Sequence, residues 1–222
     1  MREPLQYSDD VRKIILASGS PRRRELVAQM GFAFECIPSD FDEQLDDSRS
    51  MEEVARELGL GKALDVAERY PDAFVIGSDT IAMLDGKQLG KLPDAATAKE
   101  LLRQMSGKRV DVISSVALVC KDLGIQMVEA DRAAIVYAEY DDDVIDRWLA
   151  ANEWQDKAGA TGIQSPATPP VDHIEGDYDT ILGLSTRLLH ELLAAQGVDS
   201  RIVRPATQHK QRPLAQTVSD AL

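Results

Sequence analysis

Residues 14–31 read IILASGSPRRRELVAQMG, and this stretch predicts how the fold begins. The segment Arg12–Ser18 is short, apolar and rich in β-branched residues, which is typical of a buried strand. A turn follows, and Pro21 suits the first position of a helix that Gly31 ends. The chain therefore starts with a strand that leads through a tight turn into a helix.

The alternation of strands and helices continues along the chain. Further strands are expected at residues 32–38, 73–84, 109–120, 125–140 and 177–184, and further helices at 51–70, 94–105, 141–152 and 185–197. The strand at 73–84 is interrupted at residues 77–79, and the strands at 109–120 and 125–140 form one long antiparallel hairpin in this interpretation. Such a pattern indicates an α/β or mixed α+β protein with a mixed sheet.

Local signals define several boundaries of these elements. Ser50 and Glu53 form a capping box before the helix at 51–70, and Ser185 is a capping residue for the last helix. Residues 85–87 read DGK, which predicts a hairpin turn. The sequence has no internal repeat and no long linker, so we expect a single domain over residues 1–204 and a loose tail at 205–222.

The charge of the chain restricts its partners. The 222 residues include 25 Lys and Arg against 38 Asp and Glu, which gives a net charge of −13. Such a surface repels a long polyanion and argues against DNA or RNA binding, whereas a small anion remains compatible with a locally positive site. No window is apolar enough to span a membrane, and the polar N-terminus is unlike a signal peptide.

The two cysteines indicate the compartment. Cys36 and Cys120 lie in apolar, strand-like runs and are interpreted as buried thiols of a reducing compartment, without a disulfide. We therefore expect a cytoplasmic protein without membrane contact. The sequence leaves its oligomeric state open, with a homodimer as one alternative.

A basic cluster follows the first turn. Because a helix N-terminus presents free N–H groups and a positive dipole end, it suits an anion. The hydroxyls of Ser18 and Ser20 and the guanidinium groups of Arg22 and Arg23 can bind phosphate oxygens, while Arg24 is expected to face solvent. The turn is thus a candidate polyphosphate site, although it is neither a Walker A loop nor a Rossmann fingerprint. The alternative is an ordinary solvated helix face.

Asp79 is the candidate for catalysis. It follows a strongly apolar strand and a Gly-Ser break, so it should project from a strand end, where α/β proteins hold ligands. A carboxylate there can accept a proton from water or hold a divalent cation. The alternative is an Asx-turn aspartate. Lys62, Lys91 and Lys157 lie beside glycines or at element ends and could converge on one anion, although each alone is typical of a solvent-facing side chain.

The acidic loop SDFDEQ offers oxygen ligands. Asp40, Asp42 and Glu43 are ligands of the kind that Mg²⁺ or Mn²⁺ prefers, and the alternative is an ordinary acidic loop. The histidines have no metal-binding spacing, and no CxxC pair is present. Trp148 and Trp154 are interpreted as core or loop anchors rather than as stacking platforms for bases.

Several motifs together resemble those of the Maf family. They occur in the order and at the spacing of that family, from about Lys13 to Leu193, and read LASGSPRRREL, SDFDE, IGSDTIAMLDGKQLGK, MSGKRVDVISSVAL, DKAGATGIQ and EGDYDTILGLSTRLLHEL. The resemblance implies an elongated mixed sheet flanked by helices, with two lobes and a central cleft, as in the inosine triphosphate pyrophosphatases. It also implies a metal-dependent nucleoside triphosphate pyrophosphatase that yields a nucleoside monophosphate and pyrophosphate.

The resemblance also implies roles for individual residues. Asp79 matches the proton acceptor of the family. Our own hypothesis, from the chemistry of the acidic loop, is that Asp42 or Glu43 could help to hold the metal. The positions that match substrate-binding residues are Ser18, Ser20, Arg22, Arg23, Lys62, Thr80, Lys91, Lys157 and Gln164. The pair Arg22-Arg23 and Thr80 resemble the branch that acts on dTTP and UTP, since the branch that acts on 7-methyl-GTP has Trp-Arg and Gln at these places.

Some positions depart from the family pattern. Thr161 stands where the family has a tyrosine, and Ser165 stands where it has a glycine. Loss of a flat ring near the implied base pocket could loosen or shift selectivity. The catalytic carboxylate and the cationic turn are both retained.

The sequence therefore predicts hydrolysis of the α–β phosphoanhydride of dTTP, UTP or related nucleotides. Cations and metal would neutralise phosphate charge, and Asp79 would orient or deprotonate water. A second hypothesis is a non-catalytic nucleotide-binding regulator, since family members are linked to septum formation and cell division. A third is a phosphatase that acts on sugar phosphates.

Overall fold

The structure is a computed structural model that describes residues 12–42, 49–152, 154–155, 159, 161–165 and 167–200. Its helices are α1 (Pro21–Gln29), α2 (Met51–Arg69), α3 (Ala95–Met105), α4 (Asp142–Ala150), α5 (Tyr178–Leu182) and α6 (Thr186–Ala194). Its strands are β1 (Ile14–Leu16), β2 (Glu35–Cys36), β3 (Phe74–Gly77), β4 (Thr80–Leu84), β5 (Lys87–Leu89), β6 (Arg109–Cys120), β7 (Ile125–Tyr137) and β8 (Val171–Glu175). A short 3₁₀ helix, η1 (Lys121–Leu123), joins β6 to β7.

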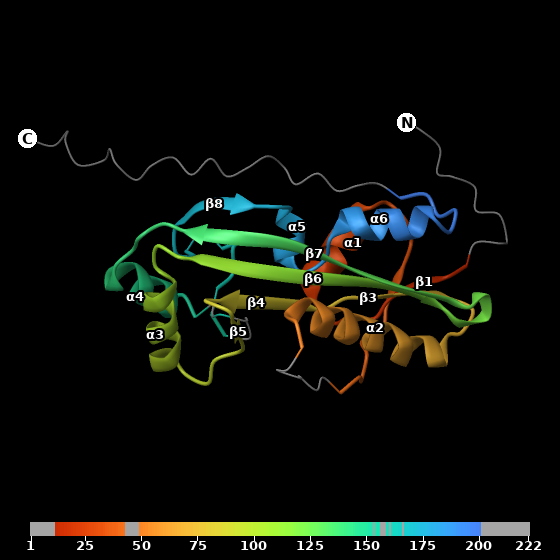
Figure 1. Cartoon of the computed structure of the whole chain (residues 1–222), viewed down its shortest axis with the longest axis horizontal. Helices are drawn as coiled ribbons and strands as arrows, with labels where there is room; N and C mark the ends of the chain where they lie inside the picture. Colours follow the sequence, from red (N-terminus) through yellow and green to blue (C-terminus); the bar gives the residue numbers. More distant parts are fainter. Residues whose placement is uncertain are drawn as a thin grey trace, which may run out of the picture.

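A mixed sheet of eight strands forms the centre of the fold (Figure 1). The hairpin β6–β7 runs along its length and is paired from Arg109↔Val136 to Cys120↔Ile125. Strands β3 and β4 lie in line along the other edge of β6, and both are antiparallel to it. Strand β1 is parallel to β2 and β3, whereas β5 and β8 are antiparallel to β4 and β7. The sheet confirms the expected mixed fold.

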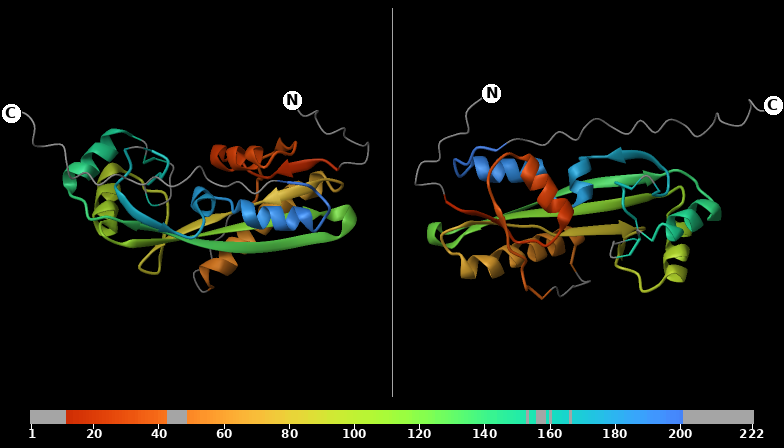
Figure 2. Two further views of the ribbon diagram at one scale, coloured as in Figure 1. Left: turned by 90° about the horizontal axis from the view of Figure 1, so that it is seen from above. Right: turned by 180° about the vertical axis from the view of Figure 1, so that it is seen from behind.

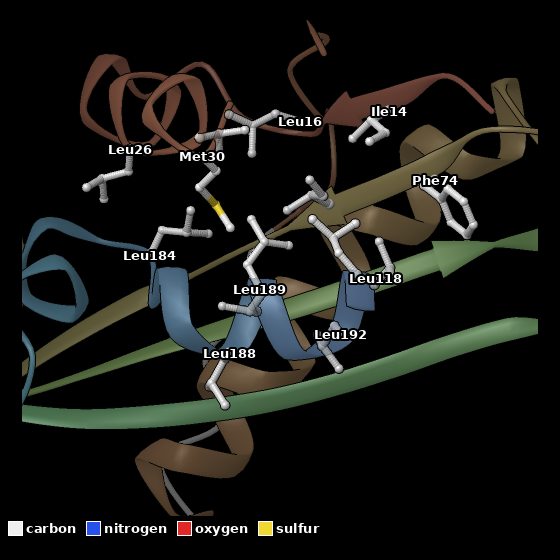
Figure 3. Close-up of a cluster of buried hydrophobic side chains, with 14 of the residues drawn as sticks. Ile14, Leu16, Leu26, Met30, Phe74, Leu118, Leu184, Leu188, Leu189 and Leu192 are labelled. Carbon is white, nitrogen blue, oxygen red and sulfur yellow. The ribbon is translucent and has the colours of Figure 1, made fainter. Parts of the chain in front are cut away.

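Helices cover the two faces of one half of this sheet. Because side chains alternate along a strand, Ile15 and Val75 pack on one face with α2, while Leu16 and Ile76 pack on the other face with α1 and α6. Figure 2 shows α2 on one side of the sheet and α1 and α6 on the other. Figure 3 shows the second of these clusters, in which leucines of α6 meet the apolar residues of β1, β3 and β6.

A third cluster occupies the other end of the molecule. Helices α3 and α4 pack there beside the far end of β6 and β7 (Figure 1). Trp148 and Trp154 are both buried in this cluster, as the sequence predicts. No helix in the described part of the chain has the length and apolar character to cross a membrane.

The local sequence signals explain where the helices begin. Ser20 caps α1, and Pro21 occupies its first turn. Ser50 and Glu53 form a complete capping box at α2. Asp94 and Asp141 cap α3 and α4, and their carboxylates satisfy N–H groups that the helix cannot. Ser185 caps α6, and its hydroxyl accepts from the N–H of Leu188. The position of Pro21, the capping box, the Ser185 cap, the hairpin turn between β4 and β5 and the break between β3 and β4 confirm the predictions, whereas the caps at Ser20, Asp94 and Asp141 were not predicted.

Three predictions are wrong or only partly correct. The expected strand at 177–184 is helix α5 followed by a turn, because the carboxylate of Asp179 accepts hydrogen bonds from the N–H groups of Thr180 and Thr186 and closes the chain locally. Strand β8 was not predicted. The expected strand at 32–38 contains only two residues, both exposed, so the interpretation of Cys36 as buried is wrong, whereas Cys120 is buried. The tail at 205–222 lies outside the described residues.

Candidate functional site

The sheet contains a gap in strand pairing beside residues 78–81. Strand β1 pairs with β3 as far as Leu16↔Ile76, and β5 pairs with β4 only from Ala82↔Leu89. Within the described ranges, no strand pairs with residues 78–81 on this side. Ser18 follows β1 and Lys91 follows β5, so each comes directly after a strand whose pairing ends at this gap.

Side chains at the gap alternate between the two faces of the sheet. Asp79 faces α2, and so does Ile81, which packs with Val54 and Leu58 of that helix. Ser78 and Thr80 face the opposite side, where both hydroxyls lie within hydrogen-bond distance of the carbonyl oxygen of Gly183. Because β1 has ended beside these residues, groups from both faces of the sheet approach the same free edge.

Asp79 is held from three directions. Its Oδ1 accepts a hydrogen bond of 2.6 Å from Nζ of Lys62, and the side chains are only 11% and 13% exposed. Its N–H donates to Oγ of Ser115 at 3.1 Å, and its carbonyl accepts from the N–H of Ser115 at 2.8 Å. The carboxylate therefore has a fixed position and a cationic neighbour, which are properties of a functional carboxylate.

Glycines bring α2 close enough for this ion pair. A Cβ at Gly77 would collide with the carbonyl oxygen of Gly59 and lie 2.8 Å from Cβ of Ala63. A Cβ at Gly59 would collide with Oγ of Ser115. Since Lys62 lies one helical turn after Gly59, the close contact directs its side chain to Asp79. The lack of a side chain at Gly59 and at Gly77 lets the backbone of α2 approach β3 closely.

The turn after β1 has the geometry of an anion site. Oγ of Ser20 accepts from the N–H of Arg23 at 3.4 Å, and Oγ of Ser18 accepts from the N–H of Ser20 at 3.2 Å. The positive end of the α1 dipole lies at this turn. Arg24 is exposed, as predicted, whereas Arg22 is half-buried and has no side-chain partner among the described residues.

The side chain of Arg23 is bound to the protein. Its Nε donates to the carbonyl oxygen of Gly183 at 2.8 Å, and its Nη2 donates to Oγ1 of Thr80 at 3.0 Å. Its Nη1 lies 3.5 Å from Oγ of Ser18. Arg23 therefore connects the turn, the strand that carries Asp79 and the segment after α5.

The start of the acidic loop is fixed to α2. The ring of Phe41 lies against Gly61, and the carboxylate of Asp65 accepts hydrogen bonds from Oγ of Ser39 and the N–H of Asp40, each at 3.0 Å. Asp42, which follows Phe41, is exposed. This attachment places residues 39–41 against the helix that carries Lys62.

The remaining predicted residues are only partly placed. Lys91 and Gln164 are exposed, and Glu43 and Lys157 lie outside the described residues. Within the described residues, no cluster of three or more His, Cys, Asp or Glu side chains is present. The structure thus brings together Asp79, Lys62 and the turn, but it gives no contact of Gln164 with them.

Thr161 contacts Tyr137 of β7, which belongs to the cluster at α3 and α4. Its side chain is hydrogen-bonded to the buried hydroxyl of Tyr137, and burial raises the pKa of Tyr137 to about 12 despite this bond. Ile163 packs against both the cluster at α1 and α6 and the cluster at α3 and α4. Residues 161–163 therefore cross from one core cluster to the other.

The sequence interpretation missed Ser78, Ser115 and Gly183. Strand alternation could have indicated Ser78, because the two sequence neighbours of Asp79, Ser78 and Thr80, lie on the sheet face opposite to that of Asp79. The role of Gly183 depends on its carbonyl group, which every residue has, so no side-chain pattern could have indicated it.

Comparisons with known proteins agree with this arrangement. The model of the family described as Maf-like protein matches residues 13–196. A dTTP/UTP pyrophosphatase of Bacillus cereus (strain AH820) is 42% identical over 183 residues, which are 82% of this chain and 95% of that protein. A protein of the same name from Bacillus anthracis is also 42% identical over 183 residues, and one from Bacillus cereus (strain ATCC 10987 / NRS 248) is 40% identical over 185 residues, with 83% and 90% of the two chains covered. The chain belongs to the Maf-like protein family.

Proposed function

We propose that this protein is a nucleoside triphosphate pyrophosphatase that hydrolyses the α–β phosphoanhydride of dTTP, UTP or related nucleotides. The products are the nucleoside monophosphate and pyrophosphate. The observation that carries the proposal is the buried Asp79–Lys62 pair at a gap in the sheet, beside a turn that suits phosphate. The names of the relatives, dTTP/UTP pyrophosphatase, support the same reaction and the same substrates.

The proposed mechanism assigns the water to Asp79. An ionised carboxylate can orient a water molecule and accept its proton as the oxygen attacks phosphorus. The bond from phosphorus to the bridging oxygen breaks, and the electron pair leaves with pyrophosphate. Positive charge for the phosphates comes from Arg22, Lys62 and Lys91, and stabilisation of this kind is the main source of catalysis in phosphoryl transfer. Ser18 and Ser20 are proposed to bind phosphate oxygens, and Lys157 is proposed as a further phosphate contact.

We also propose a requirement for Mg²⁺ or Mn²⁺. Such ions commonly bind proteins through one or two carboxylates together with substrate phosphates, so a cluster of three acidic side chains is not needed. The attachment of the loop to α2 through Phe41 and Asp65 fits this use, because α2 also carries Lys62. Asp42 and Glu43 would hold the ion. When bound, it neutralises phosphate charge and stabilises the departing pyrophosphate.

Base preference is proposed to depend on Arg22, Thr80 and Gln164. Thr80 is half-buried and bonded to Arg23, which couples this position to the turn. We propose that Thr161, at a position where the family has a tyrosine, leaves the base side less confined, and we therefore include related or modified pyrimidine nucleotides among the proposed substrates. Since these are intracellular metabolites, we propose a cytoplasmic location.

Product analysis of the wild-type protein tests the proposal. Incubation of dTTP and UTP with Mg²⁺ and, separately, with Mn²⁺ should give equimolar monophosphate and pyrophosphate. A nucleoside diphosphate with orthophosphate would contradict cleavage at the α–β anhydride. Nucleotide binding without turnover would instead favour the non-catalytic regulator, and orthophosphate release from sugar phosphates would favour the third hypothesis.

A further inference from the structure

The carbonyl oxygen of Gly183 is a shared acceptor next to the candidate site. It accepts from Nε of Arg23 at 2.8 Å and from Oγ of Ser78 at 2.9 Å, and Oγ1 of Thr80 lies 3.2 Å away. Ser78 and Thr80 are the two neighbours of Asp79 in sequence. One backbone carbonyl therefore fixes the chain on both sides of the candidate catalytic carboxylate, and it binds Arg23 from the phosphate turn as well.

The position of this carbonyl is itself fixed. Gly183 follows α5 with φ of 117°, a region that favours glycine, and a Cβ there would lie 3.3 Å from Oγ1 of Thr80 and 3.5 Å from Nε of Arg23. On its other side, the carboxylate of Asp131 accepts from Oγ of Ser185 at 2.7 Å and from Nη2 of Arg187 at 2.9 Å. The segment between α5 and α6 is thus a rigid support rather than a loose loop.

Arg22 and Arg23 have different surroundings. The guanidinium group of Arg23 donates to Gly183 and Thr80 through two different nitrogens, which fixes the orientation of its plane. Arg22 lies in the first turn of α1, at the positive end of the helix dipole, and no described side chain or carbonyl binds its guanidinium group. Of these two adjacent arginines, Arg23 is therefore bound to the protein, whereas the guanidinium group of Arg22 has no such contact within the described residues.

We propose that Arg23 is a positioning residue, which acts on the reaction through Gly183 and Thr80, and that Arg22 supplies the guanidinium group that binds the triphosphate. Ser78 is a second positioning residue that shares the Gly183 acceptor. Together they keep the phosphate turn and Asp79 in a fixed mutual geometry. This inference rests on the proposed pyrophosphatase function.

Charge-conserving variants separate the two roles. Arg23→Lys retains the charge but has a single donor nitrogen, so it cannot reproduce the separate contacts of Nε with Gly183 and of Nη2 with Thr80. We expect it to lower Tm without nucleotide by about 5 °C. We expect its kcat to fall about a hundredfold while KM stays within about twofold, because geometry rather than ground-state binding is lost. Arg22→Lys should leave Tm without nucleotide within about 1 °C of the wild-type value and raise KM about tenfold.

A non-hydrolysable ligand gives a readout that does not depend on turnover. With α,β-methylene-dTTP as the probe, the increase in Tm should be retained in Arg23→Lys and reduced in Arg22→Lys. Ser78→Ala should share the low kcat of Arg23→Lys. The matched control is Ser106→Ala, since the Ser106 hydroxyl also makes two hydrogen bonds, to the carbonyl and N–H of Tyr140 in the other half of the molecule. The control should lose stability but retain kcat.

Two results would overturn the inference while the proposed function stands. One is a loss of analogue binding in Arg23→Lys with no change in Tm without nucleotide, since this would identify Arg23 as the phosphate ligand. The other is a kcat for Ser78→Ala equal to that of Ser106→Ala. An inactive wild-type protein would instead contradict the proposed function itself.

Discussion

The ion pair between Lys62 and Asp79 can be tested by the variant Lys62→Met. Methionine has a similar length but no charge, so the substitution leaves the carboxylate of Asp79 without its cation. With 2.6 Å between Nζ and Oδ1 and an effective dielectric constant of about 20, the gross Coulomb attraction is about 6 kcal/mol. The cost of desolvating both groups offsets much of this attraction in the native protein.

The cost of breaking the pair can be larger than its net contribution to stability. Removal of one partner from a buried pair costs about 3–5 kcal/mol, because an uncompensated charge stays buried. Since 11–13% of each side chain remains exposed, water can reach the carboxylate, and we expect the lower end, about 3 kcal/mol. For a chain of this size that corresponds to a decrease in Tm of about 10 °C.

The assay is urea denaturation of four proteins at pH 7: wild type, Lys62→Met, Asp79→Asn and the double variant. The double variant has no buried charge at this position, so it should be more stable than Lys62→Met alone. We expect a coupling energy of about 2 kcal/mol between the two sites. Additive losses, with the double variant the least stable of the four, would refute the ion pair and the positioning of Asp79 that depends on it.

Three further predictions concern packing, capping and titration. Gly59→Ala should lower the free energy of unfolding by about 2 kcal/mol in urea denaturation, although alanine favours a helix by about 1 kcal/mol. The control Gly90→Ala has open space around its Cβ and should change the free energy of unfolding by less than about 0.5 kcal/mol. Equal effects of the two substitutions would contradict the close contact of α2 with β6. Ser50→Ala should cost about 1 kcal/mol by the same measurement, and no loss would show that the capping box is unimportant. Burial raises the pKa of Tyr137 to about 12, so this residue contributes stability below pH 10 that is lost as the pH rises towards 12. At pH 11, ultraviolet absorbance should therefore show less phenolate in the native wild type than in the unfolded chain. Full ionisation of the tyrosines in the native protein would contradict the burial of Tyr137.

Features that depend on a few neighbouring residues could be predicted from the sequence. The strand, turn and helix at residues 14–31 and the capping box at Ser50 and Glu53 are local signals, and the structure confirms them. Helix α5 was mistaken for a strand because an apolar stretch this short has no clear period. Its helical form is supported by Asp179, whose carboxylate accepts from the N–H of Thr180 and from the N–H of Thr186 at the start of α6.

The candidate site was predicted as a set of residues rather than as an arrangement. The sequence identified Asp79 and Lys62 separately, but their contact depends on the approach of α2 to β3 at Gly59 and Gly77. The two glycines of α2, Gly59 and Gly61, would by themselves weaken a helix, and only the tertiary packing against Ser115 and Phe41 shows why they are needed. The part played by Gly183 could not be predicted, because it uses a backbone carbonyl.

Burial of isolated residues was also difficult to predict. Cys36 occupies an apolar, alternating stretch, but it lies in β2 at the edge of the sheet, where both residues are exposed. Alternation identifies two faces of a strand, but it does not show whether another element covers either of them.

The most direct test of the proposed function is the single-turnover rate of pyrophosphate formation from dTTP by Asp79→Asn. The account predicts a decrease of about a hundredfold to ten-thousandfold, the usual contribution of a general base, with nucleotide binding retained. The matched control is Asp122→Asn, an exposed aspartate in η1 that should retain the wild-type rate. A wild-type rate in Asp79→Asn would contradict the central claim that this carboxylate activates the attacking water.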